Sequence, residues 1–351
     1  MIGTMPPSHS APGRTAARVM LQIALLLALA CLPWFAEKYY VQVVARILIL
    51  GILAMSLDLL LGYTGLVSFG HAAFYGVAAY SLAMLTPAYQ AAWFWTSFPL
   101  AVLGAAAAGL AIGFFVVRTH GIYFIMVTLA FAQMLFFLFH DTRIAGGNDG
   151  IYIDVRPDTT ILGWKPFDLE RYDQVYLLVL VLFALVWMFL RILLRSRFGH
   201  VLVGIRVNEH RMRSLGFETF RYKLACFTIA AALAGIAGYL SALQFGVVNP
   251  EFMGWHQSAA VMMMVILGGM GTLIGPVLGA SAWMLLELGF QSLPVAGSID
   301  LGKHWQLWMG AFIVLTALLL PSGLLGAWSA LWRRLHHQTP ALDADDPVAK
   351  P

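Results

Sequence analysis

The chain has 351 residues, of which 60% are hydrophobic and 11% are charged, and its formal net charge is +4. Soluble domains carry charges on roughly a quarter of their residues, so this composition excludes an ordinary water-soluble fold. The small net charge argues against nucleic-acid binding. Apolar runs of about 20 residues, the length that crosses a bilayer, recur along the chain. We therefore expect one all-α, multi-pass membrane domain.

Ten membrane segments are expected after a polar N-terminal tail, residues 1–18. They cover residues 20–36, 42–61, 66–85, 93–117, 121–140, 174–194, 224–245, 256–269, 273–290 and 304–320. Glycines and a proline separate segments 256–269 and 273–290, and such residues interrupt helices. A re-entrant loop there is the alternative, so the predicted count is eight to ten. The predicted membrane domain spans residues 19–322, and a second polar tail covers 323–351.

Lysines and arginines predict the orientation of these segments. If the chain crosses the membrane ten times, most of the 21 lysines and arginines fall on one side of the membrane, including those of the loop 195–223. A smaller number fall on the other side, which contains the loop 141–173. Positive residues accumulate in cytoplasmic loops. We therefore predict that both termini and the loop 195–223 are cytoplasmic, and that the loop 141–173 is periplasmic.

Polar side chains within apolar segments are candidates for a solute pathway. They are Asp58, Ser68, His71, Gln133 and Glu287. A lone carboxylate at the bilayer centre costs ~2.5–3.5 kcal/mol on insertion scales, so Asp58 should face the protein interior. It either lines a path or caps backbone groups freed near Gly62, and both interpretations stay open. His71 fits either a hydrogen-bonded interior histidine or a ligand. Nothing in the sequence shows that these groups converge on one site.

Two glycine-rich stretches interrupt the apolar pattern. "GYTGLVSFGH" contains Gly62, Gly65 and Gly70, and "LGGMGTLIGP" contains Gly268, Gly269, Gly271, Gly275 and Pro276. Irregular backbone at membrane depth is tolerated only where protein or a water-filled cavity surrounds it. Small residues also let membrane helices approach closely. We expect packing as the first role of these glycines and a pathway as the second.

The loop 195–223 contains a predicted amphipathic helix. At ~100° per residue, one face presents Val201, Ile205, Met212 and Leu215, and another presents Arg206, Glu209 and Arg213. Gly216 is a natural helix end. Such a helix either lies on an anionic lipid surface or docks a cytoplasmic partner. Its periodicity favours neither.

The chain lacks the short motifs of several enzyme classes. It contains no GxxxxGK[ST] phosphate loop, no HExxH, no CxxC and no GxSxG. Its two cysteines lie in apolar segments, so we expect neither a disulfide nor a metal site. Any ATP-driven step must be carried out by another chain. We expect no enzyme activity and no bound cofactor here.

Five blocks resemble the LivM-type permease family of branched-chain amino acid ABC importers. They are "LDLLLGYTGLVSFGHAAFYGVAAY" (57–80), "RTHGIYFIMVTLAFAQM" (118–134), "GGNDGI" (146–151), the stretch 204–240 and "VILGGMGTLIGPVLGA" (265–280). The resemblance covers residues 45–325 in the order found in the family. Two features depart from the expected pattern. Ala145 replaces a threonine, and His210 and Arg211 follow Glu209 where importers generally have alanines.

This resemblance implies an inner-membrane permease subunit that translocates leucine, isoleucine or valine. The implied partners are a homologous LivH-type permease, two cytoplasmic subunits that use ATP and Mg, and a periplasmic binding protein. The residues that it places in or beside the ATPase-coupling helix are Gly204, Arg206, Asn208, Glu209, Arg211, Leu215 and Gly216. Related permeases are associated with urea, short amides and aromatic acids. A self-sufficient channel or secondary transporter is the alternative from a different class.

Overall fold

The computed structural model describes most of the chain as helices. The described residues are 24, 26–86, 90–142, 146–160, 164–293, 295–296, 299–300, 302–319 and 323–326. The predicted N-terminal tail, Ala145 and nearly all of the predicted C-terminal tail lie outside them. The α-helices are Leu26–Phe35, α2 (Lys38–Thr64), α3 (His71–Leu85), α4 (Phe94–Val116), α5 (Ile122–Asp141), α6 (Tyr172–Arg195), α7 (Arg197–Ser214), α8 (Thr219–Phe245), α9 (Trp255–Gly268), α10 (Gly275–Gln291) and α11 (Trp305–Leu319).

Short elements connect these helices. They are the 3-10 turns η2 (Gly147–Asp149), η3 (Pro250–Met253) and η4 (Gly302–His304) and the strands β1 (Ile151–Tyr152), β2 (Val247–Val248), β3 (Val295–Ala296) and β4 (Ile299–Asp300). β1 pairs antiparallel with β2, and β3 pairs antiparallel with β4.

The fold is an all-α polytopic membrane protein, as predicted. Each predicted segment overlaps a helix. Among the described residues, five helices (α2, α4, α5, α6 and α8) are long and apolar enough to cross a membrane. The remaining apolar helices are shorter, so the number of complete spans stays a prediction.

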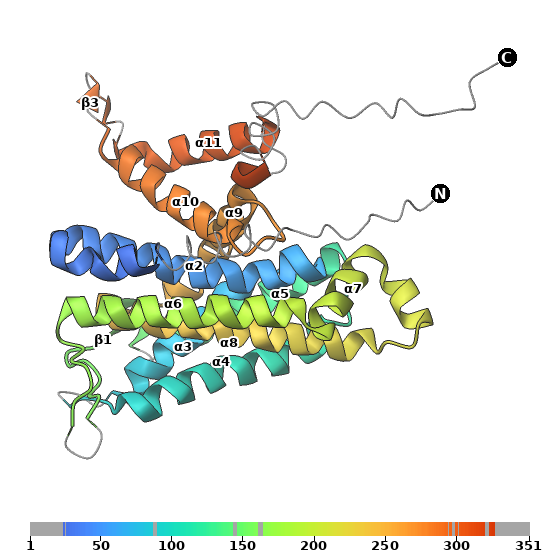
Figure 1. Ribbon diagram of the computed structural model, residues 1–351, viewed down its shortest axis with the longest axis horizontal. Coiled ribbons are helices and arrows are strands. Elements are labelled where there is room, and N and C mark those ends of the chain that lie inside the picture. Colours follow the sequence, from blue (N-terminus) through green and yellow to red (C-terminus); the bar gives the residue numbers. More distant parts are fainter. Residues whose placement is uncertain are drawn as a thin grey trace.

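α2 and α8 form the centre of the helix bundle. α8 packs against α2, α3 and α4, and Figure 1 shows α2, α6, α8 and α4 running in the same general direction. Most of the apolar stretch of α2 and α8 is buried in the protein, whereas only a minor part of that of α4, α5 and α6 is buried. The latter helices therefore present apolar surface to lipid. α9, α10 and α11 lie on another side of α2 (Figure 1).

Close approach of helices within this bundle depends on small residues. A Cβ at Gly109 in α4 would overlap Ala231 of α8, and a Cβ at Gly238 in α8 would overlap the backbone of Tyr75 in α3. Lipid gives apolar helices no hydrophobic reason to associate, so dense packing across such contacts holds the bundle together.

The predicted loops 141–173 and 195–223 lie at opposite ends of the bundle. β1, in the first loop, pairs with β2 directly after α8. Asp158 donates its N–H to the Ala92 carbonyl at 2.7 Å, and its own carbonyl accepts from Phe94 N at 2.9 Å. Figure 1 shows β1 at one end and α7 at the other.

Candidate functional site

The helix of the loop 195–223 is broken, which corrects the prediction of one continuous amphipathic face. Asn208 has extended backbone angles, φ −159° and ψ 96°, in the middle of α7. Its side-chain Oδ1 accepts a hydrogen bond from Arg211 N at 2.9 Å and thereby caps the second half of the helix. The break separates the buried Val201 and Ile205 from Leu215, which is 65% exposed.

α7 ends at Ser214, just before Gly216, which terminates the helix as the sequence predicts. Gly216 has φ +87°, a conformation that residues with a Cβ adopt at a cost. Its N–H donates to the Arg213 carbonyl at 2.9 Å, and Phe217 N donates to the Met212 carbonyl at 3.2 Å. These two bonds form a Schellman motif, which satisfies the last carbonyls of the helix.

Glu209 joins the second half of α7 to the start of α8. Its Oε1 accepts from Arg213 Nη2 at 2.6 Å, from Lys223 Nζ at 2.9 Å and from Thr219 Oγ1 at 2.9 Å. Lys223 is almost fully buried, so the pair is largely shielded from solvent. Burial raises the pKa of Glu209, but the hydrogen bonds from Lys223, Arg213 and Thr219 outweigh it and lower the pKa to about 2. Glu209 is therefore ionised at neutral pH.

Arg206 points away from Glu209 and contacts the end of α2. Its Nη1 donates to the Gly62 carbonyl, and a Cβ at Gly65 would lie 3.2 Å from Arg206 Cγ. The predicted face that groups Arg206 with Glu209 and Arg213 is therefore present only for the latter two. Arg206 binds α2, whereas Glu209 binds α8.

Asp58 accepts a hydrogen bond from the second glycine-rich stretch. Its side chain is buried, and Oδ1 lies 2.8 Å from Gly271 N. A Cβ at Gly62 would overlap both the Asp58 carboxylate and the Gly271 backbone. Asp58 thus binds a free backbone N–H, as the capping interpretation expected. This N–H belongs to the segment between α9 and α10, however, and not to the backbone near Gly62. We call this contact region, formed by Asp58, Gly62, Gly65, Arg206 and Gly271, the glycine junction.

The segment between α9 and α10 exposes backbone groups because it is not helical. Gly269 and Gly271 have φ +113° and +77°. Thr272 Oγ1 donates to the Gly269 carbonyl at 3.0 Å and accepts from Gly275 N at 3.0 Å. Pro276 stands in the first turn of α10, where a missing N–H costs nothing. A Cβ at Gly268 would overlap the Gly275 carbonyl, so α9 and α10 meet closely beside the break.

Ser68, Gly70 and His71 form a separate buried group at the start of α3. His71 Nε2 lies 2.7 Å from Ser56 Oγ in α2, and Gly70 N donates to Ser68 Oγ at 3.3 Å. A Cβ at Gly70 would overlap the backbone of α5. Among the hydrogen bonds of the described residues, none connects this group to Asp58.

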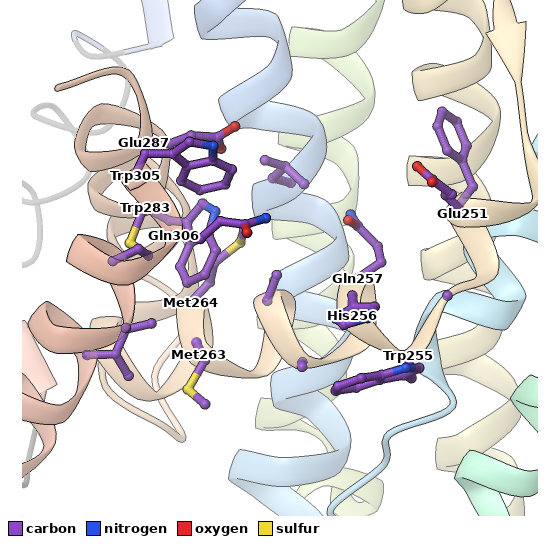
Figure 2. Close-up of a pocket in the computed structure, with 18 of the residues that line it drawn as sticks. Glu251, Trp255, His256, Gln257, Met263, Met264, Trp283, Glu287, Trp305 and Gln306 are labelled. Atoms are coloured by element: carbon purple, nitrogen blue, oxygen red, sulfur yellow. The ribbon is translucent and has the colours of Figure 1, made fainter. Parts of the chain in front are cut away.

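Gln133 of α5 and Glu287 of α10 line one cavity of about 820 Å³. Arg46 of α2 also lines it, with Nη2 3.9 Å from Glu287 Oε1. Figure 2 shows Glu287 and Trp283 from α10 near Trp305 and Gln306, with α9 continuing from Met264 toward His256. Arg46 was not among the residues predicted to line a pathway. The sequence signal that could have identified it is a guanidinium within an apolar helix.

The structure therefore divides the predicted polar residues among three places. Asp58 belongs to the glycine junction, Ser68 and His71 to the start of α3, and Gln133 and Glu287 to the cavity. They do not form a single site.

Comparisons with known proteins agree with the predicted family. A family model described as "Branched-chain amino acid transport system / permease component" matches residues 39–317. The high-affinity branched-chain amino acid transport permease LivM of Escherichia coli is 33% identical over 89% of this chain and 76% of LivM. The autoinducer 2 import permease LsrC of Photorhabdus luminescens is 26% identical over 49% of this chain and 50% of LsrC. The LivH permease of E. coli is 28% identical over 37% of this chain and 40% of LivH. No solved structure matches the chain significantly.

Proposed function

Because this chain belongs to the family of branched-chain amino acid transport permeases, we propose that it is the pathway-forming subunit of an ATP-driven, binding-protein-dependent importer. It is a multi-pass inner-membrane transport subunit rather than an enzyme. The proposed cargo is leucine, isoleucine and valine, since the family model and LivM are both named for branched-chain amino acids.

The observation that carries this proposal is the attachment of α7 to the bundle core at two points. Arg206 donates to the Gly62 carbonyl of α2, and Glu209 binds Lys223 of α8. α2 and α8 are the most buried of the long apolar helices. Coupling between distant sites travels through packed and hydrogen-bonded contacts of this kind. A force on α7 is therefore transmitted to the centre of the bundle and, through Asp58, to the break between α9 and α10.

The end of the loop 195–223 exposes apolar side chains that a protein partner can cover. Val207 is 80% exposed and Leu215 is 65% exposed. α7 projects beyond the ends of the long helices, where a soluble subunit can reach it (Figure 1). A helix with exposed apolar side chains binds in a groove of its partner. We assign this role to the groove of a cytoplasmic ATP-binding subunit.

The proposed assembly contains four further subunits besides this chain. A homologous LivH-type permease completes the membrane part, two ATP-binding subunits hydrolyse ATP with Mg, and a periplasmic protein delivers the amino acid. The distribution of lysine and arginine favours cytoplasmic termini, which places α7 on the side of the nucleotide.

Reconstitution in liposomes tests this function. With all partner subunits present, labelled leucine should accumulate only with ATP, and urea should not accumulate. The chain alone should neither hydrolyse ATP nor concentrate leucine. Ion-driven accumulation by liposomes that contain only this chain would contradict the proposal and favour a secondary transporter.

A further inference from the structure

The cavity between α2, α5 and α9–α11 combines two opposite charges with a broad apolar wall. Arg46 and Glu287 supply this pair of charges, Glu251 adds a second carboxylate, and His256, an asparagine and three glutamines add polar groups. The apolar wall is formed by Phe136, Met263, Met264, Trp283, Trp305 and Ile313. Binding sites for small molecules typically have volumes of about 300–1,000 Å³ and are apolar, with a few polar groups that fix orientation. The cavity, at about 820 Å³, has this size and composition.

Placing the charged side chains of Arg46 and Glu287 in apolar helices is energetically unfavourable. Their mutual contact does not offset this free-energy cost. The distance between Arg46 Nη2 and Glu287 Oε1, 3.9 Å, is too long for a hydrogen bond. The Arg46 side chain is 39% exposed, and open ion pairs of this kind contribute ~0–1 kcal/mol. A guanidinium can donate five hydrogen bonds. Both groups therefore keep capacity for another charged molecule.

Two further polar atoms at the cavity lack partners within the described structure. Gln133 Nε2 and Asn249 Oδ1 are buried without a hydrogen bond. An unmade hydrogen bond of a buried polar group costs about 1–3 kcal/mol. A polar molecule that enters the cavity can satisfy them.

We propose that this cavity is an intramembrane binding site for an α-amino acid zwitterion with a large apolar side chain. Arg46 binds the carboxylate, Glu287 binds the ammonium group, and the tryptophan and methionine wall receives the side chain. The two charges of an α-amino acid are attached to one carbon through bonds of about 1.5 Å. They therefore require two opposite protein charges that lie close together, as Arg46 and Glu287 do.

This inference rests on the proposed function. It favours an amino acid over the other solutes that related permeases are associated with. Urea and short amides carry neither charge, and aromatic acids without an amino group carry only the carboxylate. The cavity is much larger than one amino acid, so its size discriminates weakly among apolar side chains. The charge pair, rather than the shape of the side chain, sets the selectivity.

Equilibrium binding of tritiated leucine tests the site. The complete transporter is placed in lipid nanodiscs without the periplasmic binding protein. Competitors are leucine, leucinamide, which lacks the carboxylate, and 4-methylpentanoate, which lacks the ammonium group. Leucine should compete about 10- to 100-fold better than either analogue, the effect of one charged hydrogen bond.

Two conservative variants assign the two charges separately. Arg46→Gln should remove the advantage of leucine over leucinamide, and Glu287→Gln should remove its advantage over 4-methylpentanoate. Arg46→Lys and Glu287→Asp keep the charges and should keep part of the discrimination. The matched control is the Arg171 and Asp173 pair at the start of α6, 3.4 Å apart and outside the cavity. Arg171→Gln and Asp173→Asn should bind leucine like the wild type.

The outcomes distinguish a failure of the proposed binding site from a failure of the proposed transport function. An unchanged competition profile in folded Arg46→Gln and Glu287→Gln complexes overturns the site. Absence of saturable leucine binding in a wild-type complex that still performs ATP-dependent uptake also overturns it, and the proposed function stands. If ATP-dependent uptake itself is absent, the proposed function fails first.

Discussion

Asp58 illustrates how one buried acidic side chain is accommodated by a backbone N–H. Its carboxylate accepts the Gly271 N–H, while the adjacent turn of α2 offers the Gly62 carbonyl to Arg206. The glycines let backbone and side chain approach without intervening Cβ atoms.

Replacing Gly62 by alanine should destabilise the protein. The new methyl group would overlap the Asp58 carboxylate and the Gly271 backbone, and overpacking of this kind costs about 1–3 kcal/mol. Thermal unfolding of the detergent-purified chain should show a lower Tm for Gly62→Ala. Gly104→Ala in α4 is the control, because its Cβ would meet only Ser81 Oγ, at 3.6 Å. An equal Tm for both variants would contradict a tight junction.

Glu209 should make stability dependent on acid pH. The folded-state pKa of about 2 lies below the ordinary value of 4.5, so its stabilising effect is complete above pH 4.5 and is lost as the pH falls toward 2. Glu209→Gln should lower the Tm at pH 7, because Lys223 loses its carboxylate partner. The difference in Tm from the wild type should shrink between pH 4.5 and 2.

The control for this pH dependence is Glu218→Gln in the same loop. Glu218 is exposed and pairs with the exposed Arg221 at 2.6 Å, and exposed pairs contribute little. Its Tm should follow that of the wild type throughout. A constant difference between Glu209→Gln and the wild type from pH 7 to 2 would contradict the ionic role of Glu209.

At the scale of elements, two interruptions shape the functional regions. Asn208 divides α7, so that its first half packs on the bundle and its second half binds α8 through Glu209. The non-helical segment between α9 and α10 supplies the N–H that Asp58 binds. A continuous helix would provide neither feature: it would not turn its second half toward α8, and it would use the Gly271 N–H within the helix.

The C-terminal end of α7 should tolerate only residues that adopt positive φ. Gly216 has φ +87°, and asparagine is the next most favourable residue at such helix ends. Gly216→Asn should retain ATP-dependent leucine uptake, and Gly216→Val should lose most of it while the protein still inserts. Membrane-fraction blots check insertion. Nothing in the described structure lies within 4 Å of the Cβ position, so the expected loss is attributed to the positive φ.

At the scale of the whole molecule, the glycine junction joins the end of α2, the broken segment before α10 and the first half of α7. Its position predicts that transport and ATP hydrolysis can be separated by one substitution. Arg206→Gln should leave ATP hydrolysis by the complex largely intact, since the guanidinium binds the Gly62 carbonyl of α2.

The measurement is the amount of leucine transported per ATP hydrolysed in proteoliposomes. We expect this ratio to fall about 10-fold for Arg206→Gln, in line with the loss of one charged hydrogen bond. Arg171→Gln, at the start of α6, should keep the wild-type ratio. Parallel losses of hydrolysis and uptake would contradict a role in transmission.

The sequence by itself determined the class of protein and most of the helix positions. Apolar runs must satisfy their backbone polar groups internally in lipid, so length and hydropathy specify membrane helices with little help from tertiary contacts. The helix end at Gly216 also followed from local chemistry, because positive φ is a property of one residue.

Only the tertiary structure decided which polar groups meet. Asp58 and Gly271 are far apart in the chain, and so are Arg46 and Glu287, yet each pair lies in one contact region. Helical periodicity places a side chain on a face but does not say which helix covers that face. For the same reason the sequence grouped Arg206 with Glu209, whereas the folded chain turns the two residues toward α2 and α8.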